Sequence, residues 1–205
     1  MELKDITKWV EEFSKFGLTS DRKVKIIISP SAPYLPLLKK VGGVEQCAQD
    51  ISLDQKGAHT GEIGAFQIKE FCTYCIVGHS ERKEPPEVAI QKRDICLSLG
   101  ITPIVCFTKK ENASKTYIAN AFIAWEDPEN ISINGKYREK DAKDVREGVL
   151  AIRKNVPPEV VLIYGGSVNR GNIKEIAQIQ EIDGVLVGNA SLDPNHFADI
   201  IRCYL

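Results

Sequence analysis

Short apolar runs rich in β-branched residues recur along the chain, and stretches with helical periodicity separate them. Their apolar character is nearly continuous rather than alternating, which is typical of parallel strands that are covered on both faces. Strands that alternate with helices in this way predict an α/β fold with a parallel sheet. The predicted strands are residues 24–29, 74–79, 101–107, 121–125, 160–166 and 184–189, with residues 44–49 as a weaker seventh.

The segments between the predicted strands carry helix signals. Residues 85–100, "PPEVAIQKRDICLSLG", begin with proline and end with glycine, as helix termini commonly do. The first residues form an amphipathic stripe, because Leu3, Ile6 and Phe13 recur at helical spacing. No linker or low-complexity tract divides the chain, so we predict a single domain of residues 1–205. The other predicted helices are residues 139–155, 171–181 and 195–205.

Charge and hydropathy limit the classes of partner. The formal net charge is −1, and the chain has neither a basic run nor an acidic tail. No apolar run reaches the roughly 18 residues that span a bilayer. The first residues are charged throughout and lack a signal-peptide core. We therefore expect no nucleic-acid partner, no membrane partner and a cytoplasmic location.

The six cysteines are scattered, and most of them lie inside apolar segments. Cys72 and Cys75 form a C-x-x-C pair, but no second Cys or His pair stands at ligand spacing. We interpret the thiols as reduced core residues rather than as a zinc site, a redox site or a disulfide scaffold. No metal is expected.

Polar and glycine residues gather directly after four of the predicted strands. In parallel α/β folds, the loops at the carboxyl ends of the strands build the functional site. His79 is one of only three histidines, and taken alone such a residue is more often structural. Its place in a set of four such clusters favours a functional role. The clusters read "GHSER", "WEDPEN", "YGGSVN" and "VGNAS".

Four longer motifs, in their order and spacing, closely resemble the triosephosphate isomerase family: "YCIVGHSER", "WEDPENISINGK", "VLIYGGSVNRGNIKEI" and "DGVLVGNASL". The similarity extends over residues 24–201. It implies a TIM (β/α)8-type barrel, without metal or cofactor, that binds a small triose phosphate. The implied reaction interconverts dihydroxyacetone phosphate and glyceraldehyde 3-phosphate, a step of glycolysis and gluconeogenesis.

The resemblance also implies roles for individual residues. The reaction moves one proton between adjacent carbons through an enediolate, so it needs a base, an electrophile and a clamp for the phosphate. The family pattern makes Glu126 the base and His79, as a neutral imidazole, the electrophile. Glu81 would be a catalytic carboxylate that supports His79 or relays protons. Arg82 would be a structural ion-pair partner.

The same resemblance implies that backbone N–H groups hold the phosphate. Ser132 and Ser167 fall where the family presents loop residues to it. Gly188 and Asn189 fall at the start of the last helical turn, where the family usually has two glycines. Asn tolerates unusual backbone angles, so the amide contact is expected to survive the change.

Two departures from the family pattern stand out. Asp127 separates Glu126 from Pro128, whereas the family usually reads Glu-Pro, so the hinge is expected to behave differently. The family's first strand, with its asparagine and lysine, is missing, because the chain goes directly from Met1 into what looks like the first helix. We expect Met1 to be an internal methionine and the barrel to have two open edges. The fifth helix is expected to be much reduced.

Two hypotheses follow for the function. The first is an active isomerase; the alternative is a truncated or catalytically impaired phosphate-binding barrel subunit that lacks the N-terminal lysine. The "GAHTGE" segment, residues 57–62, resembles the loop that the family inserts into its dimer partner. We therefore expect a homodimer or a higher homo-oligomer, with Thr60 and Glu62 near the interface.

Overall fold

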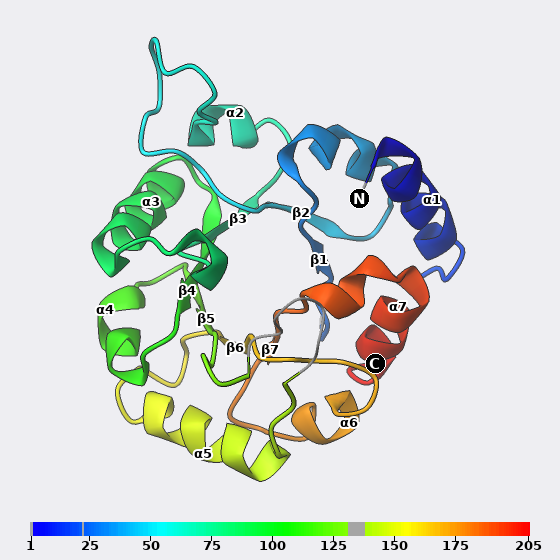
Figure 1. Ribbon diagram of the computed structural model, residues 1–205, viewed down its shortest axis with the longest axis vertical. Helices are drawn as coiled ribbons and strands as arrows, with labels where there is room; N and C mark the ends of the chain where they lie inside the picture. The colour runs from blue at the N-terminus through cyan, green and yellow to red at the C-terminus, as the bar shows by residue number, and fades with distance from the viewer. Residues whose placement is uncertain (1, 22, 131–137) are drawn as a thin grey trace.

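The computed structural model describes residues 2–21, 23–130 and 138–205, and the seven strands in these ranges form one parallel sheet. Neighbours in the sequence are neighbours in the sheet, and the sheet curls into an incomplete ring with helices around its outside (Figure 1). The predicted α/β fold is confirmed. The strands are β1 (Ile27–Ile28), β2 (Glu45–Ala48), β3 (Tyr74–Val77), β4 (Thr102–Phe107), β5 (Phe122–Trp125), β6 (Leu162–Tyr164) and β7 (Gly184–Val185).

The helices follow the predicted segments, with two differences. The helix expected over residues 171–181 is a single turn, and a 3-10 helix forms over residues 32–40, where none was predicted. Pro36 lies inside this 3-10 helix and has no N–H to donate to an α-helical ladder. The helices are α1 (Leu3–Ser14), η1 (Ala32–Lys40), α2 (Ala65–Ile68), η2 (Ser80–Arg82), α3 (Pro86–Ser98), η3 (Lys110–Asn112), α4 (Ala113–Thr116), α5 (Ala142–Arg153), α6 (Ile173–Ile176), η4 (Asn189–Leu192) and α7 (Pro194–Arg202).

Both faces of the central strands are buried, which explains their continuous apolar sequence. On β4, Ile104 and Cys106 pack inside the curled sheet. The alternate residues Val105 and Phe107 pack outward into two other apolar clusters. The strands therefore present their carboxyl ends, rather than their faces, to solvent.

The sheet is open between its first and last strands. Within the described ranges, no strand pairing joins β7 to β1, and each of these strands is two residues long. Within the described ranges, α1 is the first element and seven strands are present, which agrees with the predicted barrel short of one strand. The flank between β4 and β5 carries only η3 and the four-residue α4, so the fifth helix is reduced, as predicted. None of the described helices is long and apolar enough to cross a membrane.

Candidate active site

Glu126 directly follows β5, and its side chain is buried, with 2% of its surface exposed. Its backbone N–H donates to the carbonyl of Phe107 on β4, over 2.9 Å. The carboxylate accepts two hydrogen bonds from Ser80, one from the amide (2.8 Å) and one from the hydroxyl (2.7 Å). A buried carboxylate is costly unless it has such donors, so Ser80 holds Glu126 in this position.

His79 lies just beyond the end of β3 and caps the short helix η2. Gly78 before it has a φ of 72°, and a Cβ there would lie 2.6 Å from that of Ala89, so this turn requires glycine. The Glu81 amide donates to Nδ1 of His79 over 3.3 Å. A neutral ring that accepts at Nδ1 carries its proton on Nε2.

Nε2 of His79 lies 3.2 Å from Oε1 of Glu126. The end of β3 and the end of β5 therefore bring a carboxylate and an imidazole N–H into contact, with β4 between them. The arrangement can take a proton from a carbon acid with one group and donate a proton to an oxygen with the other.

Cys106 of β4 is a further neighbour of Glu126, and no motif pointed to it. Burial and the adjacent Glu126 carboxylate both raise the pKa of the Cys106 thiol well above its usual value. The thiol therefore stays protonated beneath the carboxylate. Ser80 was also missed as a partner of Glu126, although its place in "GHSER" was a signal that could have found it.

Glu81 and Arg82 lie on η2, which His79 caps. The Glu81 side chain is 82% exposed, and its Oε2 lies 3.9 Å from Nδ1 of His79. Both the amide and the carboxylate of Glu81 therefore lie near Nδ1 of His79. Arg82 forms ion pairs with Asp50 (2.8 Å) and Glu84 (2.9 Å), as expected of a structural residue.

Ser167 joins the loop after β6 to the segments on either side of residues 131–137. Its hydroxyl donates to the Asn130 carbonyl (2.5 Å) and accepts from the Arg138 amide (3.0 Å). Asn169 adds a hydrogen bond to Glu139 (2.6 Å). The same loop lies against Glu126, because a Cβ on Gly165 would lie 3.2 Å from Cγ of Glu126. Ser132 lies outside the described residues.

Asp127 is buried next to Glu126 and pairs with Lys140 over 2.9 Å. This hydrogen bond to Asp127 raises the pKa of Lys140. The Asp127 carboxylate also accepts from the Glu129 amide (3.1 Å). Where the family usually has a proline, this chain therefore holds the backbone next to Glu126 with a charge pair.

Gly188 and Asn189 lie in an exposed turn after β7. The Gly188 carbonyl accepts from the Ser191 amide (2.9 Å) and from the Ser191 hydroxyl (2.7 Å). The indole N–H of Trp9 donates to the Ser191 carbonyl over 2.9 Å. The turn is thus stabilised by hydrogen bonds between its own residues and by one hydrogen bond from α1.

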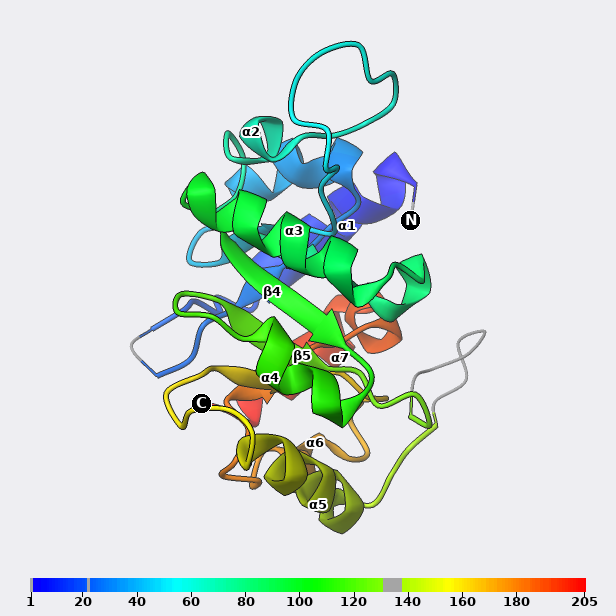
Figure 2. The same ribbon diagram turned by 90° about the vertical axis from the view of Figure 1, so that its left-hand side faces the viewer.

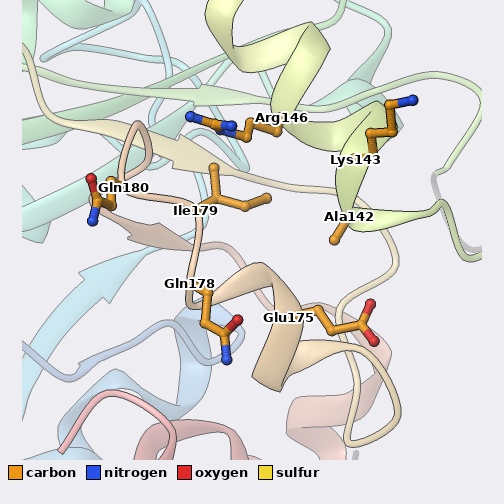
Figure 3. A pocket seen from close by; sticks show the side chains of 7 residues that line it. All are labelled: Ala142, Lys143, Arg146, Glu175, Gln178, Ile179 and Gln180. Carbon is orange, nitrogen blue, oxygen red and sulfur yellow. The ribbon is translucent and has the colours of Figure 1, made fainter.

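A surface groove lies elsewhere, between α5 and α6 (Figure 3). None of the predicted site residues lines it. Within the described ranges, no group of three or more His, Cys, Asp and Glu side chains is placed to hold a metal ion. The lining residues of the groove are Ala142, Lys143, Arg146, Glu175, Gln178, Ile179 and Gln180.

Fold and site together define a parallel α/β barrel with an acid–imidazole pair at the carboxyl ends of its strands. The family model described as Triosephosphate isomerase matches residues 1–204. The triosephosphate isomerase of Aquifex aeolicus is 32% identical over 236 residues, covering 98% of this chain and 94% of that protein. That of Polynucleobacter asymbioticus is 32% identical over 234 residues, covering 97% and 92%. The chloroplastic enzyme of Arabidopsis thaliana is 32% identical over 228 residues, covering 96% and 72%. The chain belongs to the triosephosphate isomerase family.

Proposed function

We propose that the chain, as a single domain, is an isomerase that interconverts dihydroxyacetone phosphate and glyceraldehyde 3-phosphate. Glu126 is the base, His79 is the electrophile, and Glu81 is a carboxylate that supports His79 or relays protons. Ser132, Ser167, Gly188 and Asn189 hold the phosphate. The observation that carries the proposal is the 3.2 Å separation between Nε2 of His79 and Oε1 of Glu126.

In this mechanism Glu126 takes a proton from one carbon of the substrate and returns it to the adjacent carbon. The Nε2–H of His79 faces the oxygen on which negative charge develops, which stabilises the enediolate. Oε1 of Glu126 now occupies the place in front of Nε2. A substrate oxygen that accepts from Nε2 therefore displaces the carboxylate toward the carbon acid.

The alternative is a catalytically impaired phosphate-binding subunit. It is supported by the surroundings of Glu126. Within the described ranges, Glu126 has no Lys or Arg at ion-pair distance. Loss of one electrostatic contact of this kind costs about 10²–10³ in rate, so a slow enzyme is compatible with both the fold and the pair.

Replacement of Glu126 by Gln tests the proposal. The amide keeps the shape of the side chain but is a very weak base, so we expect kcat to fall by about 10²–10⁴-fold with little change in KM. The measurement is a coupled assay of triose phosphate interconversion. Glu129→Gln is the matched control, because that side chain is 81% exposed and lies three residues away.

Two outcomes would contradict the proposal. Equal kcat in the wild type and in Glu126→Gln would remove the base from the mechanism. A wild-type chain that binds inorganic phosphate but does not turn over either triose phosphate would favour the alternative.

The proposal includes a homodimer or a higher homo-oligomer and a location in the cytosol. Residues 56–63 are exposed and project from the body of the molecule above α2 (Figure 2). Ile63 is 40% exposed in this loop and Leu53, near its start, is 39% exposed, so a partner would cover apolar surface there. The six free thiols fit a reducing compartment. Light scattering of the purified chain measures the oligomeric state.

A further inference from the structure

Helix α1 lies beside the opening of the sheet, next to η1 on one side and α7 on the other (Figure 1). η1 follows β1 and α7 follows β7 and its turn. Because no strand pairing joins β1 to β7 within the described ranges, α1 is placed to connect the two free ends of the sheet through side chains.

The side chains of α1 form one apolar cluster with both ends. Trp9 and Phe13 are stacked, with ring centroids 4.8 Å apart and planes 10° from parallel. Phe13 in turn packs on Phe197 of α7, with centroids 5.7 Å apart. The buried members of the cluster come from α1, from the β1 and η1 region and from α7: Trp9, Val10, Phe13, Ile26, Ile28, Leu38, Val41 and Ile201.

Trp9 adds a directional contact to this packing. It is buried, with 5% of its surface exposed, and its Nε1–H donates to the Ser191 carbonyl over 2.9 Å. Ser191 bonds back to the Gly188 carbonyl through its amide and its hydroxyl. The indole therefore reaches the turn of residues 188–192 from the opposite end of the chain.

We propose that α1 connects the two free ends of the sheet by packing against both of them. Trp9 is the positioning residue through which α1 holds the turn of residues 188–192. The link to phosphate affinity rests on the function proposed above. β7 is only two residues long, so it holds this turn weakly. The hydrogen bond from Trp9 reduces the number of conformations that the turn adopts before phosphate binds. Trp9 contacts the turn and acts on the ligand through it.

Trp9→Phe is the test, because phenylalanine keeps the stacked ring and removes the N–H. One neutral hydrogen bond corresponds to about 2–10-fold in an equilibrium. We expect backbone amides of residues 188–192 to exchange with solvent faster by that factor. KM for triose phosphate and the inhibition constant of inorganic phosphate should rise by a similar factor, with kcat unchanged.

Phe16→Leu is the matched control. Phe16 packs on Phe13 in the same cluster, and its ring contacts within the described ranges are with Phe13 and Arg202. We expect this variant to lower the melting temperature while leaving exchange at residues 188–192 and the phosphate inhibition constant unchanged. An effect of Phe16→Leu on the turn equal to that of Trp9→Phe would reduce the role of Trp9 to packing and overturn the proposal.

Equal exchange at residues 188–192 in the wild type and in Trp9→Phe would also overturn it. This comparison needs no enzyme activity. It therefore tests whether Trp9 holds the turn even if the wild type proves inactive and the proposed function fails. Should Trp9→Phe not fold, the wild type still gives an answer. Its two indole N–H signals belong to Trp9 and Trp125, and rapid solvent exchange of the Trp9 signal would exclude the hydrogen bond.

Discussion

The middle of the sheet and its two ends are built differently. β4 pairs with each of its neighbours, β3 and β5, through four residues, and nearly every residue of these three strands is buried. β1 and β7 each pair through two residues, and both residues of β7 are half-exposed. His79 and Glu126 follow strands of the middle, whereas Gly188 and Asn189 follow an end strand.

This difference separates two demands on the proposed site. An acid–imidazole pair needs fixed geometry, and long strands buried on both faces supply it. A phosphate turn on a short end strand needs support from outside the sheet. In this chain the support comes from α1, through a contact that joins residues 182 positions apart.

Amide hydrogen exchange should show the largest difference between the middle strands and the end strands. Amides of β3, β4 and β5 should exchange only when the whole domain unfolds, whereas amides of β1 and β7 should open locally. We expect protection to differ by about 4 kcal/mol, or about 10³-fold in rate. Mass spectrometry or NMR at neutral pH measures it. Uniform protection of the amides in all seven strands would contradict the expected difference between the middle and the ends of the sheet.

A pair of glycine substitutions gives the next contrast. In Gly148→Ala the new Cβ on α5 would collide with the Trp125 ring of β5. We expect this overlap to outweigh the better helix propensity of alanine and to lower the free energy of unfolding by about 1–3 kcal/mol.

Gly184→Ala on β7 is the counterpart at the end of the sheet. A Cβ there meets no atom within 4 Å, so we expect a change of less than about 0.5 kcal/mol. Urea unfolding of both variants measures the two free energies. A larger loss of unfolding free energy in Gly184→Ala than in Gly148→Ala would contradict the expected difference between the middle and the end of the sheet.

A further prediction concerns the charge pair of Asp127 and Lys140, next to Glu126. Lys140→Met leaves the buried Asp127 without its cation, and we expect a loss of about 1 kcal/mol in the free energy of unfolding, since Lys140 is partly exposed. Lys143→Met, at an exposed position of α5, is the control, and we expect it to change the free energy of unfolding little.

The pH dependence of this loss follows from the raised pKa of Lys140. A cation whose pKa is higher in the folded state stabilises fully below its unfolded value, near the ordinary 10.5, and this stabilisation disappears as pH rises through the folded value. The difference between wild type and Lys140→Met should therefore stay constant up to about pH 10 and shrink above it. A difference that grows above that pH would contradict the pairing.

Apolar patterning located the middle strands closely and the end strands poorly. The predicted strand 101–107 is observed as Thr102–Phe107, but 24–29 shrinks to Ile27–Ile28 and 184–189 to Gly184–Val185. A strand with a partner on one side only keeps fewer ladder hydrogen bonds, and this depends on a neighbour that the local sequence does not contain. The motifs pointed to His79 and Glu126, while the hydrogen bonds of Ser80 and Trp9 went unpredicted.

The sequence by itself determined the order of strands and helices, the parallel sheet and the family, because these depend on local periodicity and on motifs in a fixed order. Only the tertiary structure decided that Ser80 holds Glu126, that Ser167 bonds to the segments flanking residues 131–137, and that Trp9 supports the turn after β7. Each of these contacts joins residues at least 29 positions apart. Such contacts arise when packing brings particular donors and acceptors together, and no local pattern encodes them.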